Sequence, residues 1–140
     1  MTDLLIAEDD EDIAAILIRM FRRAALTVSR APDGAAAWEM IIASPPHVVL
    51  TDIGMPRLDG WELIHAVHRN ERLAETPIAV FSGHLQPGDT RIVEYGACVL
   101  LSKPCPNERL VAAVEQLADL GRHRHHGAGA ACDDLNLIPG

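Results

Sequence analysis

Five short segments with strand-like patterns recur along the chain. Four of them are unbroken apolar runs rich in branched side chains, at residues 4–7, 48–50, 78–81 and 99–101. Continuous apolarity over so few residues is typical of strands that are covered on both faces. The fifth segment, Val28-Ser29-Arg30-Ala31, alternates apolar and polar positions, which favours a strand at the edge of a sheet.

A helical pattern follows the first apolar run. Its apolar residues recur three and four positions apart, and they are Ile13, Ile16, Leu17, Met20 and Phe21. This spacing places them along one face of an α-helix, so the segment is predicted to be an amphipathic helix.

Four more helices are predicted after the remaining strands. Asp33 is the predicted N-cap of the second helix, because an aspartate at this position accepts a hydrogen bond from the first turn. The fourth helix has the weakest pattern and ends at Gly96, whereas the fifth begins near Asn107 and ends before Gly121. The predicted ranges, in chain order, are 34–41, 60–68, 89–95 and 107–120.

Strand and helix therefore alternate through five βα units. Such alternation implies parallel strands joined by right-handed crossovers, and hence an open sheet with helices on both faces. The fold class is α/β, and we predict a single doubly wound (βα)5 domain over residues 1–121, with a flavodoxin-like parallel five-stranded sheet. The predicted strand order is 2-1-3-4-5, which places the alternating strand at an edge and a switch point beside the first and third strands.

Residues 122–140 break the alternation. They contain Arg122-His123-Arg124-His125-His126, followed by a stretch of glycine and alanine, and we expect a flexible C-terminal tail. The histidines could bind a transition metal, but a solvated basic extension is the favoured interpretation because no fixed scaffold holds the imidazoles.

Composition narrows the class of protein. A chain of 140 residues that is 49% hydrophobic fits one core, and its net charge of -8 argues against direct binding to nucleic acid. The apolar runs are too short to cross a bilayer, and Asp3 and Glu8 stand where a signal peptide would carry basic residues. We expect a soluble, cytoplasmic protein, with no membrane partner, whose three cysteines are reduced thiols.

Polar residues follow four of the predicted strands. Glu8 and Asp9 follow the first strand, Asp52 the third, Ser82 the fourth and Lys103 the fifth. In an open parallel sheet these strand ends face one crevice, so segments far apart in sequence would deliver carboxylates, a hydroxyl and an ammonium to the same place.

The charges of this set predict a divalent metal. Glu8, Asp9 and Asp52 carry -3 when ionised, and a divalent ion together with Lys103 would bring +3. An all-oxygen ligand set favours Mg²⁺ or Mn²⁺, which would also recruit phosphate oxygens. Because Asp52 stands alone at its strand end, it is the predicted nucleophile, one that would form an aspartyl phosphate.

Four motifs in this order resemble the CheY-like receiver domain of two-component response regulators. The resemblance covers about residues 3 to 120, and its specificity lies in the joint spacing of the motifs. They are Ile6-Ala7-Glu8-Asp9-Asp10, Leu50-Thr51-Asp52-Ile53-Gly54-Met55-Pro56 with Asp59-Gly60, Phe81-Ser82-Gly83, and Gly96-Ala97 leading to Lys103-Pro104.

The resemblance implies a role for each matching residue. Asp52 would be the phosphoacceptor, and Ser82 and Lys103 would each contact a phosphoryl oxygen. The metal ligands would be the carboxylates of Glu8, Asp9 and Asp52 and the backbone carbonyl of Gly54. Asp9 would be a more direct ligand than Glu8. Asp10 is instead predicted to cap the first helix.

The resemblance also implies partners. The phosphodonor would be the phosphohistidine of a sensor histidine kinase or of a histidine phosphotransfer protein. A downstream protein would dock on the face formed by the fourth helix, the fifth strand and the fifth helix, and a phosphorylation-dependent homodimer is a further option.

The chain would be a signalling module that assists its own phosphotransfer and dephosphorylation, rather than a classical enzyme. No output domain is expected after the fifth helix, so the chain is either a stand-alone regulator or part of a longer protein.

Two positions depart from the family pattern, and two more leave a property open. Leu100 stands where many members carry a tyrosine or phenylalanine that changes rotamer on phosphorylation, and Cys105 stands where a bulky apolar residue is usual. Coupling from Ser82 to the surface could therefore be weaker, or run through the loop after the fourth strand. Gly54 and His84 flank the predicted phosphoryl position, and glycine has no side chain to orient water.

Two other functions are less consistent with the sequence than a receiver. An aspartate-nucleophile phosphatase would use a second acid two residues after the nucleophile, where this chain has Gly54. A degenerate receiver that serves only for docking is disfavoured by the complete set of acids, hydroxyl and amine. Taken singly, Asp52 could cap a turn and Lys103 could be merely exposed, but their joint placement favours a site.

Overall fold

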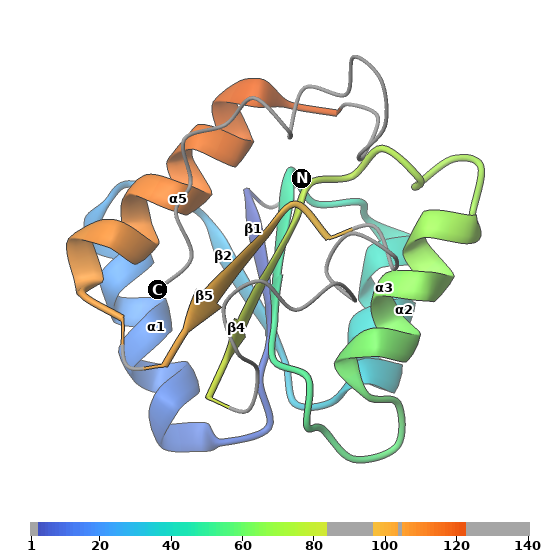
Figure 1. Ribbon diagram of the computed structural model, residues 1–140, viewed down its shortest axis with the longest axis horizontal. Helices are drawn as coiled ribbons and strands as arrows, with labels where there is room; N and C mark the ends of the chain where they lie inside the picture. Colours follow the sequence, from blue (N-terminus) through green and yellow to red (C-terminus); the bar gives the residue numbers. More distant parts are fainter. Residues whose placement is uncertain (1–2, 84–96, 104, 123–140) are drawn as a thin grey trace.

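One parallel sheet forms the centre of the protein (Figure 1). The computed structural model describes residues 3–83, 97–103 and 105–122, with the side chain of Ser102 outside the description. The strands, which confirm the five predicted segments to within one residue at their ends, are β1 (Leu4–Ala7), β2 (Val28–Ala31), β3 (Val48–Thr51), β4 (Ile78–Ser82) and β5 (Val99–Ser102). Their order, β2-β1-β3-β4-β5, also confirms the prediction.

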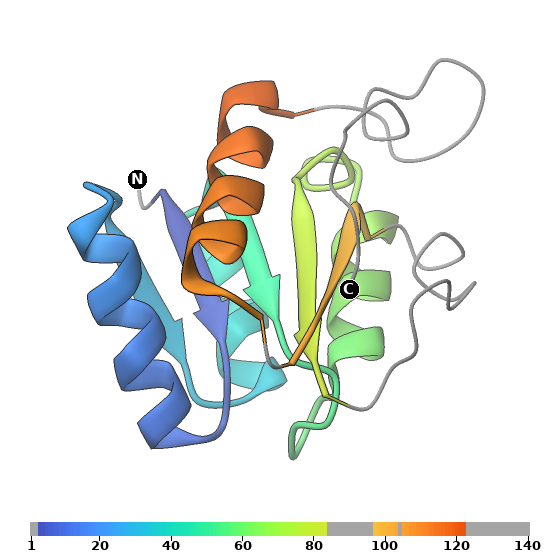
Figure 2. The ribbon, with the colours of Figure 1, turned by 60° about the vertical axis from the view of Figure 1, so that its left-hand side comes forward.

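Helices cover both faces of the sheet, as expected for a doubly wound fold. Helices α1 and α5 lie on one face, and α2 and α3 lie on the other (Figures 1 and 2). Their bounds are α1 (Glu11–Arg23), α2 (Gly34–Ala43), α3 (Gly60–Arg69) and α5 (Asn107–Leu120). The helix predicted over residues 89–95, His84, and the tail from residue 123 onward fall outside the described residues.

Aspartates start three of the helices close to the strand ends. The Asp10 carboxylate accepts hydrogen bonds from the backbone N–H groups of Asp12 and Ile13, at 2.9 and 3.0 Å, which confirms its predicted capping role. Asp33 caps α2 in the same way. Asp59 and Glu62 form a reciprocal capping box at the start of α3. Each cap satisfies backbone donors that the first helical turn leaves without partners.

Two apolar clusters hold the helices to the sheet. On the face of α2 and α3, strand residues pack against helix residues that include Ile41, Leu63, Ile64 and Val67. On the opposite face the corresponding helix residues are Leu17 and Phe21 of α1 and Leu110, Val114 and Leu117 of α5. Because both faces are covered, the central strands are apolar throughout rather than alternating, which explains the pattern of their sequences.

Ile16 is the exception to the apolar face predicted for α1. It is 62% exposed, whereas Leu17 and Phe21 are buried and Ile13 and Met20 are partly buried against the core. At about 100° per residue, position 16 lies at the margin of the stripe that these residues form. Ile16 instead lines a groove of about 560 Å³ between α1 and the start of α5.

The described cysteines are free thiols. Cys98 is buried and Cys105 is half-buried, and both are thiols, whereas Cys132 falls outside the described residues. Among the residues that the structure describes, no helix combines the length and apolarity needed to cross a membrane.

Asp3 ties the start of β1 to its neighbours and should make the stability of the protein acid-sensitive. Its carboxylate accepts a hydrogen bond from the Thr27 N–H at 2.9 Å and lies 3.2 Å from Nδ1 of His47. The Thr27 hydrogen bond is the main cause that lowers the pKa of Asp3 below its ordinary value. The stabilisation is therefore complete above that ordinary pKa and is lost as the pH falls through the lower pKa of the folded state. Asp3→Asn should reduce stability near neutral pH but flatten its decline in acid, as measured by urea unfolding across pH. Equal acid sensitivity in the variant would contradict this assignment.

Candidate phosphoacceptor site

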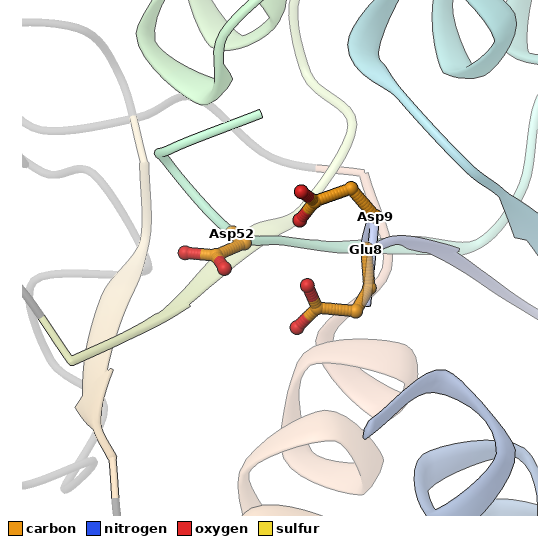
Figure 3. A group of neighbouring side chains, drawn as sticks. All are labelled: Glu8, Asp9 and Asp52. Atoms are coloured by element: carbon orange, nitrogen blue, oxygen red, sulfur yellow. The ribbon is translucent and has the colours of Figure 1, made fainter. Parts of the chain in front are cut away.

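Three carboxylates meet at the carboxyl ends of β1 and β3. Glu8 and Asp9 follow β1 and Asp52 follows β3, and the two strands are neighbours in the sheet. The Asp52 N–H continues the sheet hydrogen bonding by donating to the Ala7 carbonyl at 3.0 Å. One oxygen from each of the three carboxylates lies within 4.8 Å of the others (Figure 3).

The two acids after β1 have different surroundings. Glu8 is 2% exposed, whereas Asp9 lies at the surface of the crevice. The two side chains leave the backbone in different directions, as Figure 3 shows. Glu8 also accepts a hydrogen bond from the Asp10 N–H at 3.3 Å. Asp9 is thus the more accessible acid of the pair.

Lys103 joins this cluster from the other half of the sheet. Its Nζ lies 3.1 Å from Glu8 Oε1 and 3.1 Å from Asp52 Oδ2, so one ammonium contacts both carboxylates. The ammonium also lies 5.1 Å from the centre of the Phe81 ring, a distance at which the ring face attracts a cation. Lys103 is the only lysine in the sequence.

Burial and charge shift two pKa values in this cluster. Burial of the Glu8 carboxyl is the main cause that raises its pKa, and the hydrogen bond from Lys103 opposes the shift. For Lys103, burial alone would lower the pKa, but the hydrogen bond to Glu8 and the charge of Asp52 outweigh it and the pKa is raised. Lys103 therefore stays a cation next to the predicted acceptor.

Asp52 is held by its own loop. Its Oδ1 accepts a hydrogen bond from the Ile53 N–H at 2.7 Å, and its backbone carbonyl accepts one from Thr51 Oγ1 at 2.8 Å. The side chain keeps 11% of its surface exposed. Both carboxylate oxygens thus have a donor that fixes their orientation, while the group remains accessible from the crevice.

The other predicted site residues occupy neighbouring strand ends and loops. Ser82 is the fully buried last residue of β4, and its carbonyl accepts a hydrogen bond from the Lys103 N–H at 3.0 Å. Gly54 is exposed in the turn two residues after Asp52. Leu100 is buried in the cluster under α2 and α3, and Cys105 lies half-buried before α5. The roles predicted for these residues stay predictions.

The donor set of the cluster fits a hard divalent cation. The three clustered side chains each offer a carboxylate oxygen, a ligand that Mg²⁺ and Mn²⁺ prefer. Magnesium ligands at about 2.1 Å in an octahedron are roughly 3–4 Å apart, so the observed spread of up to 4.8 Å requires only small side-chain rotations. Glu8, Asp9 and Asp52 would hold the ion, and Lys103 would remain beside it.

Two arginines near the site were not singled out by sequence reasoning. The guanidinium of Arg30 donates to the backbone carbonyl of Glu8 from Nε at 3.1 Å and from Nη2 at 2.8 Å. Arg57, in the loop after β3, lies 3.5 Å from the Asp33 carboxylate that caps α2. In the sequence, Arg30 was only a polar position of an alternating strand, and nothing in its neighbours signals a contact with residue 8.

Comparison with known proteins agrees with this geometry. Residues 4–115 match the family model of the response regulator receiver domain. The transcriptional regulatory protein PrrA of Mycobacterium tuberculosis is 33% identical over 137 residues, which cover 97% of this chain and 57% of that protein. The regulatory protein YesN of Bacillus subtilis is 29% identical over 130 residues, which cover 90% of this chain and 35% of that protein.

Solved structures show the same fold. The receiver domain of the Francisella response regulator 1452 superposes with a TM-score of 0.75 and 25% identity, covering 86% of this chain and 98% of that one. Receiver domains are signalling modules rather than classical enzymes. The chain belongs to the family of response regulator receiver domains of two-component systems. It spans about one third to just over half of the curated relatives named above.

Proposed function

We propose that Asp52 accepts a phosphoryl group from a phosphohistidine donor in a Mg²⁺-dependent reaction. The proposal depends on one observation: Glu8, Asp9 and the Lys103 ammonium all lie close to the accessible carboxylate of Asp52. Phosphoryl transfer needs little covalent chemistry from a protein beyond the nucleophile, because positioning and neutralisation of the phosphoryl oxygens supply most of the catalysis.

The residues of the site would divide this work. A carboxylate oxygen of Asp52 forms the new bond to phosphorus, while the bond from phosphorus to the donor's imidazole nitrogen breaks and that nitrogen keeps the electron pair. The Lys103 ammonium, 3.1 Å from Asp52 Oδ2, is placed to neutralise a phosphoryl oxygen. The Ser82 hydroxyl would hydrogen-bond another oxygen.

The metal site would complete the charge balance. Asp9, Glu8, Asp52 and the Gly54 carbonyl are the proposed ligands, with Asp9 the most direct because it is the exposed member of the pair. When bound, a divalent cation would supply positive charge to the transferring phosphoryl group.

The proposed partners are argued from the family and from the net charge of the chain. A sensor histidine kinase or a histidine phosphotransfer protein is the proposed donor, and the proposed location is the cytoplasm. The net charge of -8 favours a protein as the downstream target over direct nucleic-acid contact. The proposed docking face includes β5 and α5, and the helix predicted over residues 89–95, which would complete this face, lies outside the described residues. Phosphorylation-dependent pairing of two copies is a further option. Self-catalysed loss of the phosphoryl group is also part of this proposal.

The test is incubation with a small acyl phosphate and Mg²⁺, followed by intact-mass measurement. The wild-type chain should gain one phosphoryl group, Asp52→Asn should gain none, and removal of Mg²⁺ by a chelator should prevent labelling of the wild type. Asp119→Asn, an exposed position at the end of α5, is the matched control and should label like the wild type.

Three results would contradict the proposal. An adduct that persists in Asp52→Asn would place the acceptor elsewhere. Multiple turnover of small phosphate esters would favour a phosphatase, whereas absence of labelling with intact folding would favour a degenerate receiver used only for docking.

A further inference from the structure

The Arg30 side chain donates hydrogen bonds to the Glu8 carbonyl, just after β1, where no backbone N–H of β2 is available. The ladder between β1 and β2 runs in register from Leu4 with Val28 to Ala7 with Ala31, and the Glu8 N–H still donates to the Ala31 carbonyl at 3.1 Å. In a parallel ladder the Glu8 carbonyl would next accept from the backbone N–H of residue 33. The chain has by then left the sheet through Pro32, and Asp33 caps α2.

The Arg30 guanidinium contacts this carbonyl with two donors. Its Nε and Nη2 lie 3.1 and 2.8 Å from the Glu8 oxygen, and Nη2 reaches the Asp9 carbonyl at 3.4 Å. Arg30 pairs with Ile6 in the sheet register, so its side chain leaves β2 on the face of α1 and α5 and extends along the strand to residue 8. The planar fork of arginine suits such a paired contact, which a lysine ammonium cannot reproduce.

These bonds fix the backbone from which both acids project. The Glu8 residue is held on its N–H side by the Ala31 carbonyl and on its carbonyl side by Arg30. With that peptide unit fixed, the Glu8 side chain is directed toward Lys103 and the Asp9 side chain toward Asp52. From this geometry we infer that Arg30 is a positioning residue, which orients the acidic pair for a divalent cation through the backbone carbonyls of Glu8 and Asp9.

Charge alone predicts the opposite effect on metal binding. A guanidinium next to the cluster repels a divalent cation, so removing it should tighten Mg²⁺ binding if its charge were what matters. A positioning role predicts weaker binding in the same variant, because loss of a group that orients metal ligands typically costs 10–100-fold in affinity. A role confined to joining β2 to β1 predicts lower thermal stability with unchanged Mg²⁺ affinity.

The inference rests on the proposed function only for the identity of the metal. Mg²⁺ binding to the unphosphorylated chain would be measured by calorimetry for the wild type, Arg30→Gln and Arg30→Lys, with thermal unfolding measured in parallel. Arg22→Gln, an exposed arginine of α1, is the matched control. We expect an affinity about 10-fold weaker for Arg30→Gln, a smaller loss for Arg30→Lys, and no change for Arg22→Gln.

Labelling by acyl phosphate separates binding from transfer. At saturating Mg²⁺ the Arg30→Gln variant should label at close to the wild-type rate, whereas at low Mg²⁺ it should label more slowly.

Unchanged or tighter Mg²⁺ binding in folded Arg30→Gln would overturn the inference. If Arg30→Gln fails to fold, the same measurement on Arg30→Lys decides, since an unchanged affinity there overturns it equally. A wild-type chain that binds Mg²⁺ but is never labelled would refute the proposed function alone.

Discussion

Replacing Lys103 by methionine should slow phosphorylation of Asp52 by about 10²–10³-fold, the usual cost of removing one donor that stabilises developing charge. The Lys103 ammonium is 3.1 Å from Asp52 Oδ2 and is held there by Glu8 and by the face of Phe81. Methionine keeps much of the side-chain length but carries no charge and no donor. The phosphoryl oxygens would then lose the cation that the protein itself supplies.

The same variant should bind Mg²⁺ as tightly as the wild type or more tightly. The ammonium contacts two of the three proposed ligands, Glu8 and Asp52, and so competes with a second cation for their charge. The measurement is the rate of adduct formation by intact mass, together with Mg²⁺ affinity by calorimetry. Arg22→Met removes an exposed positive charge from α1 and should change neither quantity. Parallel loss of Mg²⁺ binding and labelling in Lys103→Met would indicate a collapsed site instead.

The composition of the chain offers an independent check on this lysine. Because Lys103 is the only lysine, an amine-specific reagent can modify only this side chain and the N-terminus. Reaction at Lys103 should be slow in the wild type, where two carboxylates hold the ammonium and keep its pKa raised, and faster in Asp52→Asn. Equal rates in both proteins would show that the contact with Asp52 is absent in solution.

Gly60→Ala is expected to destabilise the protein and to displace the acceptor strand. Gly60 is the first residue of α3, and a Cβ at this position would lie 2.1 Å from the Asp52 carbonyl oxygen and 2.7 Å from Ile53 Cα. Both atoms are backbone, so the clash can be relieved only if the end of β3 moves away from α3. Overpacking of this kind costs about 1–3 kcal/mol, which outweighs the gain of at most about 1 kcal/mol from the better helix propensity of alanine.

Thermal unfolding and Mg²⁺ binding together test this prediction. The melting temperature should fall by a few degrees, and Mg²⁺ affinity should fall because Asp52 is one of the proposed ligands. Gly83→Ala is the matched control for stability, since among the described residues a Cβ there would meet the Lys103 side chain at 3.6 Å, an ordinary contact. An unchanged melting temperature in Gly60→Ala would mean that α3 and β3 are less closely packed than the structure shows.

The order of the elements followed from local patterns in the sequence. Unbroken apolar runs separated by amphipathic segments predicted five parallel strands, and the alternating run at Val28 to Ala31 predicted which strand lies at the edge. The capping role of Asp10 was equally local, because a cap and the turn that it satisfies are adjacent in the chain. Parallel topology then placed the acids and the lysine at one edge of the sheet without any coordinates.

Contacts between distant segments could not be predicted in the same way. The sequence does not show that Lys103 contacts Glu8 and Asp52 together, or that Glu8 is buried while its neighbour Asp9 is exposed. Ile16 fitted the apolar spacing of α1 and yet is exposed, because the packing of α5 decides where the covered stripe ends.

The sequence by itself determined the fold class, the order of the strands and the set of chemical groups at their ends. Only the tertiary structure decided how those groups are oriented, and it revealed the contact of Arg30 with the Glu8 carbonyl. The physical reason is the distance along the chain between interacting residues. Secondary structure and caps depend on residues within a few positions of one another. The orientation of a carboxylate instead depends on hydrogen bonds from strands that lie tens of residues away in the chain.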